Sequence, residues 1–220
     1  MAIMNVNPTR MQLSKLKKQL TTALRGHKLL KDKRDELMRQ FLNLIRENKA
    51  LRAKVESELS LVNNHFVEAS AVMSAEALDA ALLMPKQQVT LTTESRNVMS
   101  VEIPVYHTST RTDDEGDVFP YGFAFTSFEL DDAVSHLNSL LPDLIRLAEI
   151  EKSAELMADE IEKTRRRVNA LEHVLIPRYR DTIRFISMKL EENERGSRTR
   201  LMKVKDMMLE QAHHYSEDIK

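Results

Sequence analysis

Cysteine is absent from the 220 residues of this chain, which excludes disulfide bonds, thiolate metal sites and cysteine nucleophiles. Tryptophan is also absent, and the chain has only four glycines and six prolines. So few turn-forming residues leave little material for the connections of a many-element globule, whereas 30% charged residues suits long, solvated helices. The composition predicts an elongated, mainly α-helical protein in a reducing compartment.

Motifs of catalysis are missing as well. The glycines stand at positions 26, 116, 122 and 196, so they form neither a GxxxxGK[ST] phosphate loop nor a GxGxxG turn, and the chain has no HExxH or GxSxG. No run approaches the roughly 18 consecutive apolar residues of a membrane span, and the first nine residues lack a basic leader. We expect a soluble cytoplasmic protein that is not an enzyme and holds no cofactor or metal.

The formal net charge of −1 conceals a strong segregation. Residues 74–160 carry 5 basic and 17 acidic residues, a net of −12, while the two flanking segments together carry 28 basic and 17 acidic residues, a net of +11. If the chain folds back on itself, one end is basic and the other acidic.

The first regular segment is a long helix. Thr9 and Gln12 fit a reciprocal capping box at its start. A heptad seam then runs for about sixty residues, which would span about 90 Å at helical rise. Its positions are Leu13, Leu16, Leu20, Ala23, His27, Leu30, Arg34, Leu37, Phe41, Leu44, Asn48, Leu51 and Val55, with Val62, Ala69 and Val72 following more loosely.

Two features interrupt this helix. His27, Arg34 and Asn48 occupy seam positions, where polar side chains set the register between helices at a cost in stability. Gly26 costs about 1 kcal/mol relative to alanine inside a helix. Either another group approaches the backbone closely at Gly26, or the helix bends there.

The period changes to two after Pro85. Alternation through Val89–Thr93 and Met99–Val105 predicts a β-hairpin with Glu94–Asn97 as its turn, followed by a polar loop from His107. Because Pro104 cannot donate a ladder hydrogen bond, the second strand is expected at an edge.

An aromatic segment follows the hairpin. Its five aromatic residues are Phe119, Tyr121, Phe123, Phe125 and Phe128. Aromatic side chains bury much area, so they could form a small packed head. The alternative is an exposed surface that binds a partner.

Helical spacing returns near Asp131 and continues to the C-terminus, through Ala133, Leu137, Leu140, Leu144 and Leu147 and later through Ile161, Thr164 and Val168. From Leu171 to Leu190 the apolar residues recur at a longer, eleven-residue pattern, which locally unwinds a left-handed supercoil. Pro177 lies in this stretch, where an interior proline costs roughly 3 kcal/mol unless a kink absorbs it. We interpret it as a functional kink, with a tolerated, solvent-facing kink as the alternative.

These elements predict two long helices in an antiparallel coiled-coil hairpin with a small β-hairpin head between them. The expected divisions are an N-terminal helix at 1–84, a β-hairpin and aromatic head at 85–128, and a C-terminal helix at 129–220. An intramolecular hairpin is favoured over a parallel homodimer, because a dimer would have to accommodate two inserts side by side.

The basic segment at residues 10–34, with nine Lys or Arg and one Asp, could indicate nucleic-acid binding. Its positive charges alternate with an apolar seam and lack aromatic residues for base stacking, so acidic protein surfaces are the favoured partners and no nucleic acid is expected.

Two blocks near the ends resemble a known family. The first block is Pro8, Thr9, Arg10, Leu13, Lys17, Leu20, Ala23, Gly26, Leu29, Leu30, Lys31, Lys33, Arg34, Asp35 and Leu37. The second contains Thr164 and the pattern RRVNALE-x-V-x-IP at 166–177, and it continues through Ile183, Phe185, Ile186, Leu190, Glu192, Glu194, Arg195, Arg200 and Leu201. Together they cover about a third of the chain. They resemble the D subunit, which is the central rotor shaft of the V-type and A-type rotary ATPases.

The resemblance implies a non-catalytic shaft inside a hexamer of catalytic A and nucleotide-binding B subunits. Its lower part would bind the F subunit of the central stalk and a socket subunit (C/d) above the membrane ring, with no direct membrane insertion. The shaft would couple ATP hydrolysis or synthesis to proton or sodium ion transport, in the soluble sector peripheral to the membrane.

We add the hypothesis that a basic set faces acidic loops of the hexamer, namely Lys31, Lys33, Arg34, Arg165, Arg166 and Arg167, and that Gly26 and Pro177 form a kink or bearing. The competing function is a non-rotating coiled-coil scaffold or tether.

Overall fold

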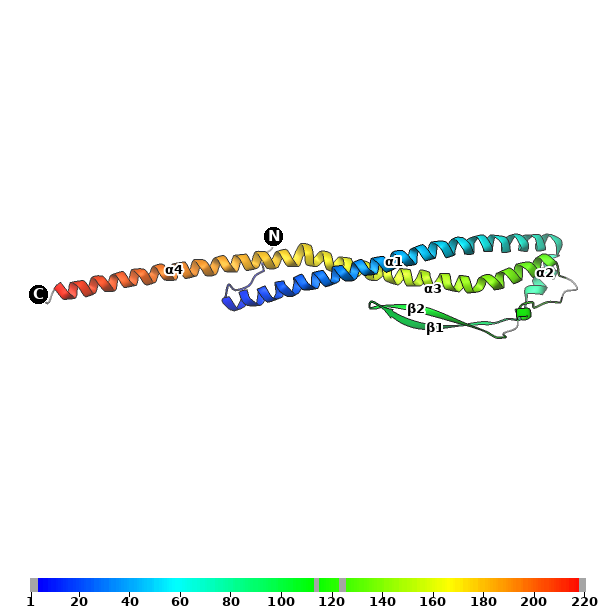
Figure 1. The fold of residues 1–220 in the computed structure, drawn as a ribbon, viewed down its shortest axis with the longest axis horizontal. Coiled ribbons are helices and arrows are strands. Elements are labelled where there is room, and N and C mark those ends of the chain that lie inside the picture. Colours follow the sequence, from blue (N-terminus) through cyan, green and yellow to red (C-terminus); the bar gives the residue numbers. More distant parts are fainter. Residues whose placement is uncertain (1–3, 113–114, 123–125, 218–220) are drawn as a thin grey trace. The chain divides into compact units, whose positions relative to one another are not determined.

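The computed structural model describes residues 4–112, 115–122 and 126–217 and divides the chain into two units. One unit contains residues 1–32 and 164–220, and the other contains residues 33–163. The helices are α1 (Arg10–Val72), α2 (Ala75–Leu82), α3 (Phe128–Ala170) and α4 (Ile176–Glu217), with a π-turn, η2 (Leu171–Leu175), between the last two. The strands β1 (Val89–Val98) and β2 (Val101–Thr110) and a short 3₁₀ turn, η1 (Glu115–Val118), lie between α2 and α3 (Figure 1). The expected fold, mainly α with one β-hairpin, is confirmed.

Thr9 caps the start of α1, since its Oγ1 accepts a hydrogen bond of 3.2 Å from the Gln12 N–H. The Thr9 N–H, however, donates to the Asn7 carbonyl at 2.9 Å. Half of the expected capping box is therefore present, and a backbone turn replaces the reciprocal half.

In the unit formed by residues 1–32 and 164–220, α1 and α4 run antiparallel. The Met4 N–H donates to Thr182 Oγ1 at 3.2 Å, Arg10 pairs with Glu194 at 2.5 Å, and His27 lies 3.2 Å from Glu172. Within α1, the partner falls from Glu194 for Arg10 to Glu172 for His27, which defines the antiparallel direction, and Met4 contacts α4 from the segment before α1. The buried seam of this unit consists of Leu16, Thr164, Val168, Ile176, Thr182 and Ile186.

The unit formed by residues 33–163 repeats the antiparallel arrangement between α1 and α3. Ion pairs join Lys33 to Glu160 at 3.4 Å, Glu47 to Arg146 at 2.7 Å and Lys54 to Asp143 at 2.6 Å. Nearer the C-terminal end of α1, the rings of His65 and His136 stack with their centroids 5.8 Å apart. Leu37 of α1 packs with Met157 and Ile161 of α3, and Ala69 packs with Leu130. The other buried seam residues are Val55 and Val62 of α1 and Ala133, Leu140, Ile150 and Ala154 of α3.

Two seam assignments were wrong. Val72 is 72% exposed and Leu137 is 46% exposed. Val72 is the last residue of α1, where the chain leaves the helix for a break that the sequence pattern did not predict. Ser74 explains the restart at α2, because its side chain accepts a hydrogen bond from the Ala77 N–H at 3.3 Å.

The β-hairpin has a different turn from the one predicted. Glu94–Asn97 belongs to β1, and the turn is Met99–Ser100, with positive φ of 52° and 70°. Two residues with positive φ form the tight turn that suits the twist of a hairpin, normally with Asn or Gly. Asn97 supports the turn from outside, since its Oδ1 accepts the Ser100 N–H at 3.1 Å. The strand β2 also extends to Thr110, so residues 107–110 are not the start of a loop.

The hairpin lies along α3 (Figure 1). Its turn end packs against the helices in a cluster built on Leu37, Val101, Met157 and Ile161. As expected from Pro104, β2 is an edge strand, since the sheet has only two strands.

The aromatic segment is packed at some residues and exposed at another. Tyr121 packs against a second cluster, formed by Ala69, Ala81 and Leu130, and Phe119 meets Tyr121 edge to face at 6.1 Å. Phe128 is 71% exposed, so it does not belong to a packed head, and this agrees with the alternative of an exposed surface at that residue. Phe123 and Phe125 lie outside the described residues.

Candidate functional site

The triple arginine lies near the end of α3, in the unit formed by residues 1–32 and 164–220. Arg165, Arg166 and Arg167 are all exposed, whereas Thr164 and Val168 on either side are buried. Successive helical residues point about 100° apart, so the three guanidinium groups spread around the helix rather than forming one fork. Arg166 has an interaction partner within the chain.

The other predicted basic residues are placed differently. Lys31 is exposed in the same unit as the triple arginine, whereas Lys33 and Arg34 belong to the unit formed by residues 33–163. Lys33 pairs with Glu160 at 3.4 Å, and Arg34 donates to Asp35 Oδ1 through Nε at 2.9 Å and through a terminal nitrogen at 2.6 Å. Acidic neighbours therefore offset part of the positive charge of Lys33 and Arg34.

Pro177 is the second residue of α4, and Ile176 alone separates it from the π-turn η2. The Ile176 N–H donates to the Leu171 carbonyl five residues earlier, which widens the helix just before the proline. A π-turn relieves the clash that a proline ring makes with the preceding turn of an α-helix, so the helix continues through Pro177. The predicted loosening of the helix is thus a π-turn of five residues, and Pro177 is half-buried rather than solvent-facing.

Gly26 and His27 have distinct environments. A Cβ added to Gly26 would meet no atom within 4 Å among the described residues outside its own helix, so close backbone approach within this part of the chain does not explain the glycine. His27 lies 3.2 Å from Glu172 in η2, and this hydrogen bond is the main cause that lowers the pKa of Glu172. The expected role of His27 in setting register fits this pairing between helices.

A groove of about 420 Å³ adjoins the π-turn. Its lining includes the apolar side chains of Leu171 and Leu175 together with Lys15 and Lys18 of α1 and Tyr179 of α4. The groove can receive an apolar side chain beside an acidic one, because it combines an apolar wall with two ammonium groups. Sequence reasoning missed it, since no local pattern in α1 specifies which turn of the partner helix widens.

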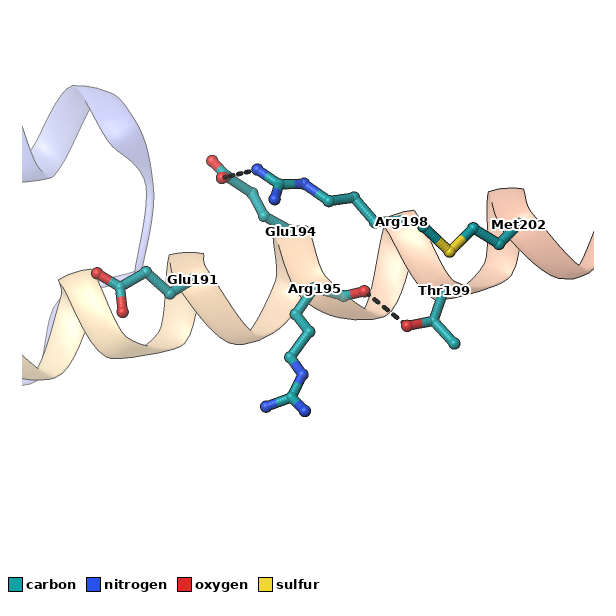
Figure 2. Close-up of a pocket in the computed structure, with 6 residues that line it drawn as sticks. All are labelled: Glu191, Glu194, Arg195, Arg198, Thr199 and Met202. Atoms are coloured by element: carbon teal, nitrogen blue, oxygen red, sulfur yellow. Dashed lines mark hydrogen bonds and ion pairs between the residues drawn. The ribbon is translucent and has the colours of Figure 1, made fainter.

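A shallow pocket on α4 is lined by two glutamates and two arginines (Figure 2). Glu194 pairs with Arg198 at 3.9 Å, and Thr199 Oγ1 donates to the Arg195 carbonyl at 3.0 Å. Because two carboxylates lie beside two guanidinium groups on one helix, this surface suits polar contacts with another protein more than capture of a single anion. The lining residues are Glu191, Glu194, Arg195, Arg198, Thr199 and Met202.

No group of three or more His, Asp or Glu side chains is arranged to hold a metal ion within residues 4–112, 115–122 and 126–217. None of the helices in these ranges is long and apolar enough to cross a membrane.

Sequence reasoning also overlooked a second interior proline. Pro142 lies inside α3, which continues as an α-helix on both sides of it. A kink was predicted at Pro177 alone, although the same local signal was present at Pro142.

The fold and the exposed basic surface define a class of antiparallel helical-hairpin proteins with an inserted β-hairpin. The family model for the D subunit of ATP synthase matches residues 12–206. The chain belongs to this family.

Curated relatives agree with that assignment. The chain is 61% identical over 219 residues to the V-type ATP synthase D subunit of Acetivibrio thermocellus, covering 100% of this chain and 99% of the relative. It is 58% identical over 212 residues to the protein of the same name from Clostridioides difficile, covering 96% and 95% of the two chains. The resemblance stated from the sequence is confirmed, and the comparisons give no support to a non-rotating scaffold.

Proposed function

We propose that this chain is the non-catalytic rotor of the central stalk in a V-type ATPase. It transmits torque between ATP hydrolysis or synthesis in a hexamer of A and B subunits and proton or sodium ion transport across a membrane. It works in the soluble, cytoplasmic sector of the complex, peripheral to the membrane. Its further partners are the F subunit of the stalk and the socket subunit (C/d) above the membrane ring.

The observation that carries this proposal is that a buried apolar seam and interhelical ion pairs together join the antiparallel helices within each unit. A buried seam resists separation of the helices, and ion pairs between them, such as Lys54 with Asp143 and Arg10 with Glu194, oppose sliding. Each exposed pair contributes only about 0.2–1 kcal/mol, so the seam provides most of the stability and the pairs fix the register. A helix pair that neither separates nor slides can transmit torque.

Arg165, Arg166, Arg167 and Lys31 are the residues we assign to the contact with acidic loops of the hexamer. Their exposure supports this role, because rim charges guide association and allow movement more than they add affinity. Lys33 and Arg34 stay in the predicted set with smaller expected contributions, since each has an acidic partner within the chain.

Gly26 and Pro177 remain the proposed bearing. The widened turn before Pro177 and the open space at Gly26 offer two positions on different helices of the same unit where the surface departs from a regular coiled coil. Such departures can receive side chains of a surrounding subunit.

The test compares wild type with R165A/R166A/R167A and with the charge-preserving control R165K/R166K/R167K, each expressed with the complete complex. We expect the alanine variant to lower complex yield or ATP-driven ion transport at low salt, and the lysine control to stay near wild type. If the alanine variant matched wild type in complex yield and in ATP-driven ion transport at every salt concentration, the role of these arginines would be refuted. Native mass measurement of the purified complex checks the stalk assignment itself, which requires one copy of this chain per complex.

A further inference from the structure

The two outer edges of the β-hairpin are chemically different. Val98 pairs with Val101 across the two-residue turn, and all ten residues of β1 pair one to one with β2. In an antiparallel ladder the hydrogen-bonding direction of the backbone alternates along each strand. Starting from the Val98–Val101 pair, the backbone groups of even-numbered β1 residues face β2, and those of odd-numbered residues from Val89 to Asn97 face outward.

The outer edge of β2 is blocked. On that strand the outward positions are the even-numbered residues, which include Pro104 and Tyr106. Pro104 has no N–H to offer, and the Tyr106 N–H donates to Glu149 of α3 at 3.4 Å. Proline and covering side chains are the means by which proteins prevent a further strand from pairing at an edge.

The outer edge of β1 is open. Leu91, Thr93, Ser95 and Asn97 are exposed, and no hydrogen bond to their outward backbone groups occurs among the residues that the structure describes. The strand contains neither proline nor lysine, and its one-to-one register with β2 contains no β-bulge. The outward N–H and C=O groups of these four residues are thus available to another backbone.

An extended polypeptide is the ligand that complements this edge, because only another strand presents donors and acceptors at the same spacing. A two-stranded hairpin is at best marginally stable by itself, and this one packs against the helices mainly at its turn end. A third strand would therefore stabilise the part of the hairpin far from the turn. Opposite charges at Glu94 and Arg96 favour a strand with a basic residue beside the first and an acidic residue beside the second.

We propose that β1 accepts an extended segment of another protein of the complex as a third strand, an assignment that depends on the stalk function proposed above. The partner is a different chain, because the stalk function places one copy of this protein in the complex. A second copy is the competing occupant, since an antiparallel pair of β1 strands centred on Ser95 would bring each Glu94 beside the other Arg96.

The test is hydrogen exchange at single-residue resolution on the purified V-type complex and on the isolated full chain. In the isolated chain, the amides of Leu91, Thr93, Ser95 and Asn97 should exchange rapidly while those of the even-numbered β1 residues are protected. In the complex, exchange of these outward amides should slow by at least about tenfold, the factor that corresponds to roughly 1.4 kcal/mol of binding.

Three results are distinguishable. Outward amides that exchange equally fast in the complex and in the isolated chain would overturn strand addition and leave the stalk function intact. Failure of the chain to purify with A and B subunits would overturn the stalk function itself. Protection that appears in the isolated chain and rises with its concentration would identify a second copy as the occupant and overturn the partner proposed here.

A matched pair of variants provides an independent check. Thr93→Pro removes an outward N–H from the open edge, and Thr108→Pro makes the same change on the outer edge of β2. We expect T93P to abolish the additional protection in the complex and T108P to retain it. Protection of the Thr92 and Glu94 amides in each isolated variant verifies that the hairpin still forms, and equal behaviour of the two variants would contradict the proposal.

Discussion

Replacing Leu37 with alanine should be among the most destabilising single substitutions in the unit formed by residues 33–163. Leu37 is fully buried at the place where α1, α3 and the hairpin turn meet. Its neighbours in that cluster are Val101 of β2 and Met157 and Ile161 of α3. The side chain thus joins segments that are far apart in the sequence.

The magnitude follows from the lost contacts. Burying a leucine side chain contributes about 1.5–3 kcal/mol, and the cavity left by truncation adds to the loss. We expect L37A to lower the free energy of unfolding by about 3 kcal/mol. Met38 is the matched control, because it is the next residue on the same helix but is 40% exposed, and M38A should cost under about 1 kcal/mol.

The assay is denaturant unfolding of the isolated full chain, followed by far-ultraviolet circular dichroism. Val101→Ala is measured alone and together with L37A. Because the two side chains belong to one cluster, the double variant should depart from additivity by roughly 0.5 kcal/mol or more. A cost below that of M38A, or strict additivity with V101A, would refute the packing described for this cluster.

Three further predictions concern local features. Gly26→Ala should raise the free energy of unfolding by about 1 kcal/mol, because an added Cβ has open space, and a lower melting temperature would contradict this. Ser100→Gly should stabilise the hairpin by about 1 kcal/mol, since φ at Ser100 is 70°; unchanged amide protection in β1 would count against it. Glu172 has a lowered pKa in the folded chain, so its stabilising effect is present above its unfolded pKa and is lost as pH falls through the folded pKa. Glu172→Gln should therefore reduce the stability difference between neutral pH and about pH 3, measured by denaturant unfolding, and an unchanged difference would exclude the His27 hydrogen bond as its source.

Local errors in the sequence-based prediction have physical explanations. The turn of the hairpin was misplaced because Met99 and Ser100 lack the Asn or Gly that normally marks positive φ, whereas Asn97 carries that signal and lies in the strand. The break after Val72 was missed, although Ser74 offered a helix-capping residue. The longer apolar period near Pro177 did indicate a departure from the regular coil, and the structure identifies it as a π-turn.

The candidate site was only partly readable from the sequence. The positions of Arg165 to Arg167 and their exposure follow from charge and helical spacing, since charged side chains between seam positions point to solvent. The pairing of Lys33 with Glu160 could not be predicted, because it depends on how two segments more than a hundred residues apart are aligned.

The sequence alone determined the long helices, most of their seam positions and the presence of two strands, because hydrophobic spacing reflects the period of each local structure. The residues of the two terminal blocks identified the family. Only the tertiary structure decided that the hairpin turn packs on Leu37, that Glu149 and Pro104 block one edge of the hairpin while β1 stays open, and that His27 meets the π-turn. These features depend on contacts between distant segments, whose register is fixed by packing across the helix pairs and not by the local period of either partner.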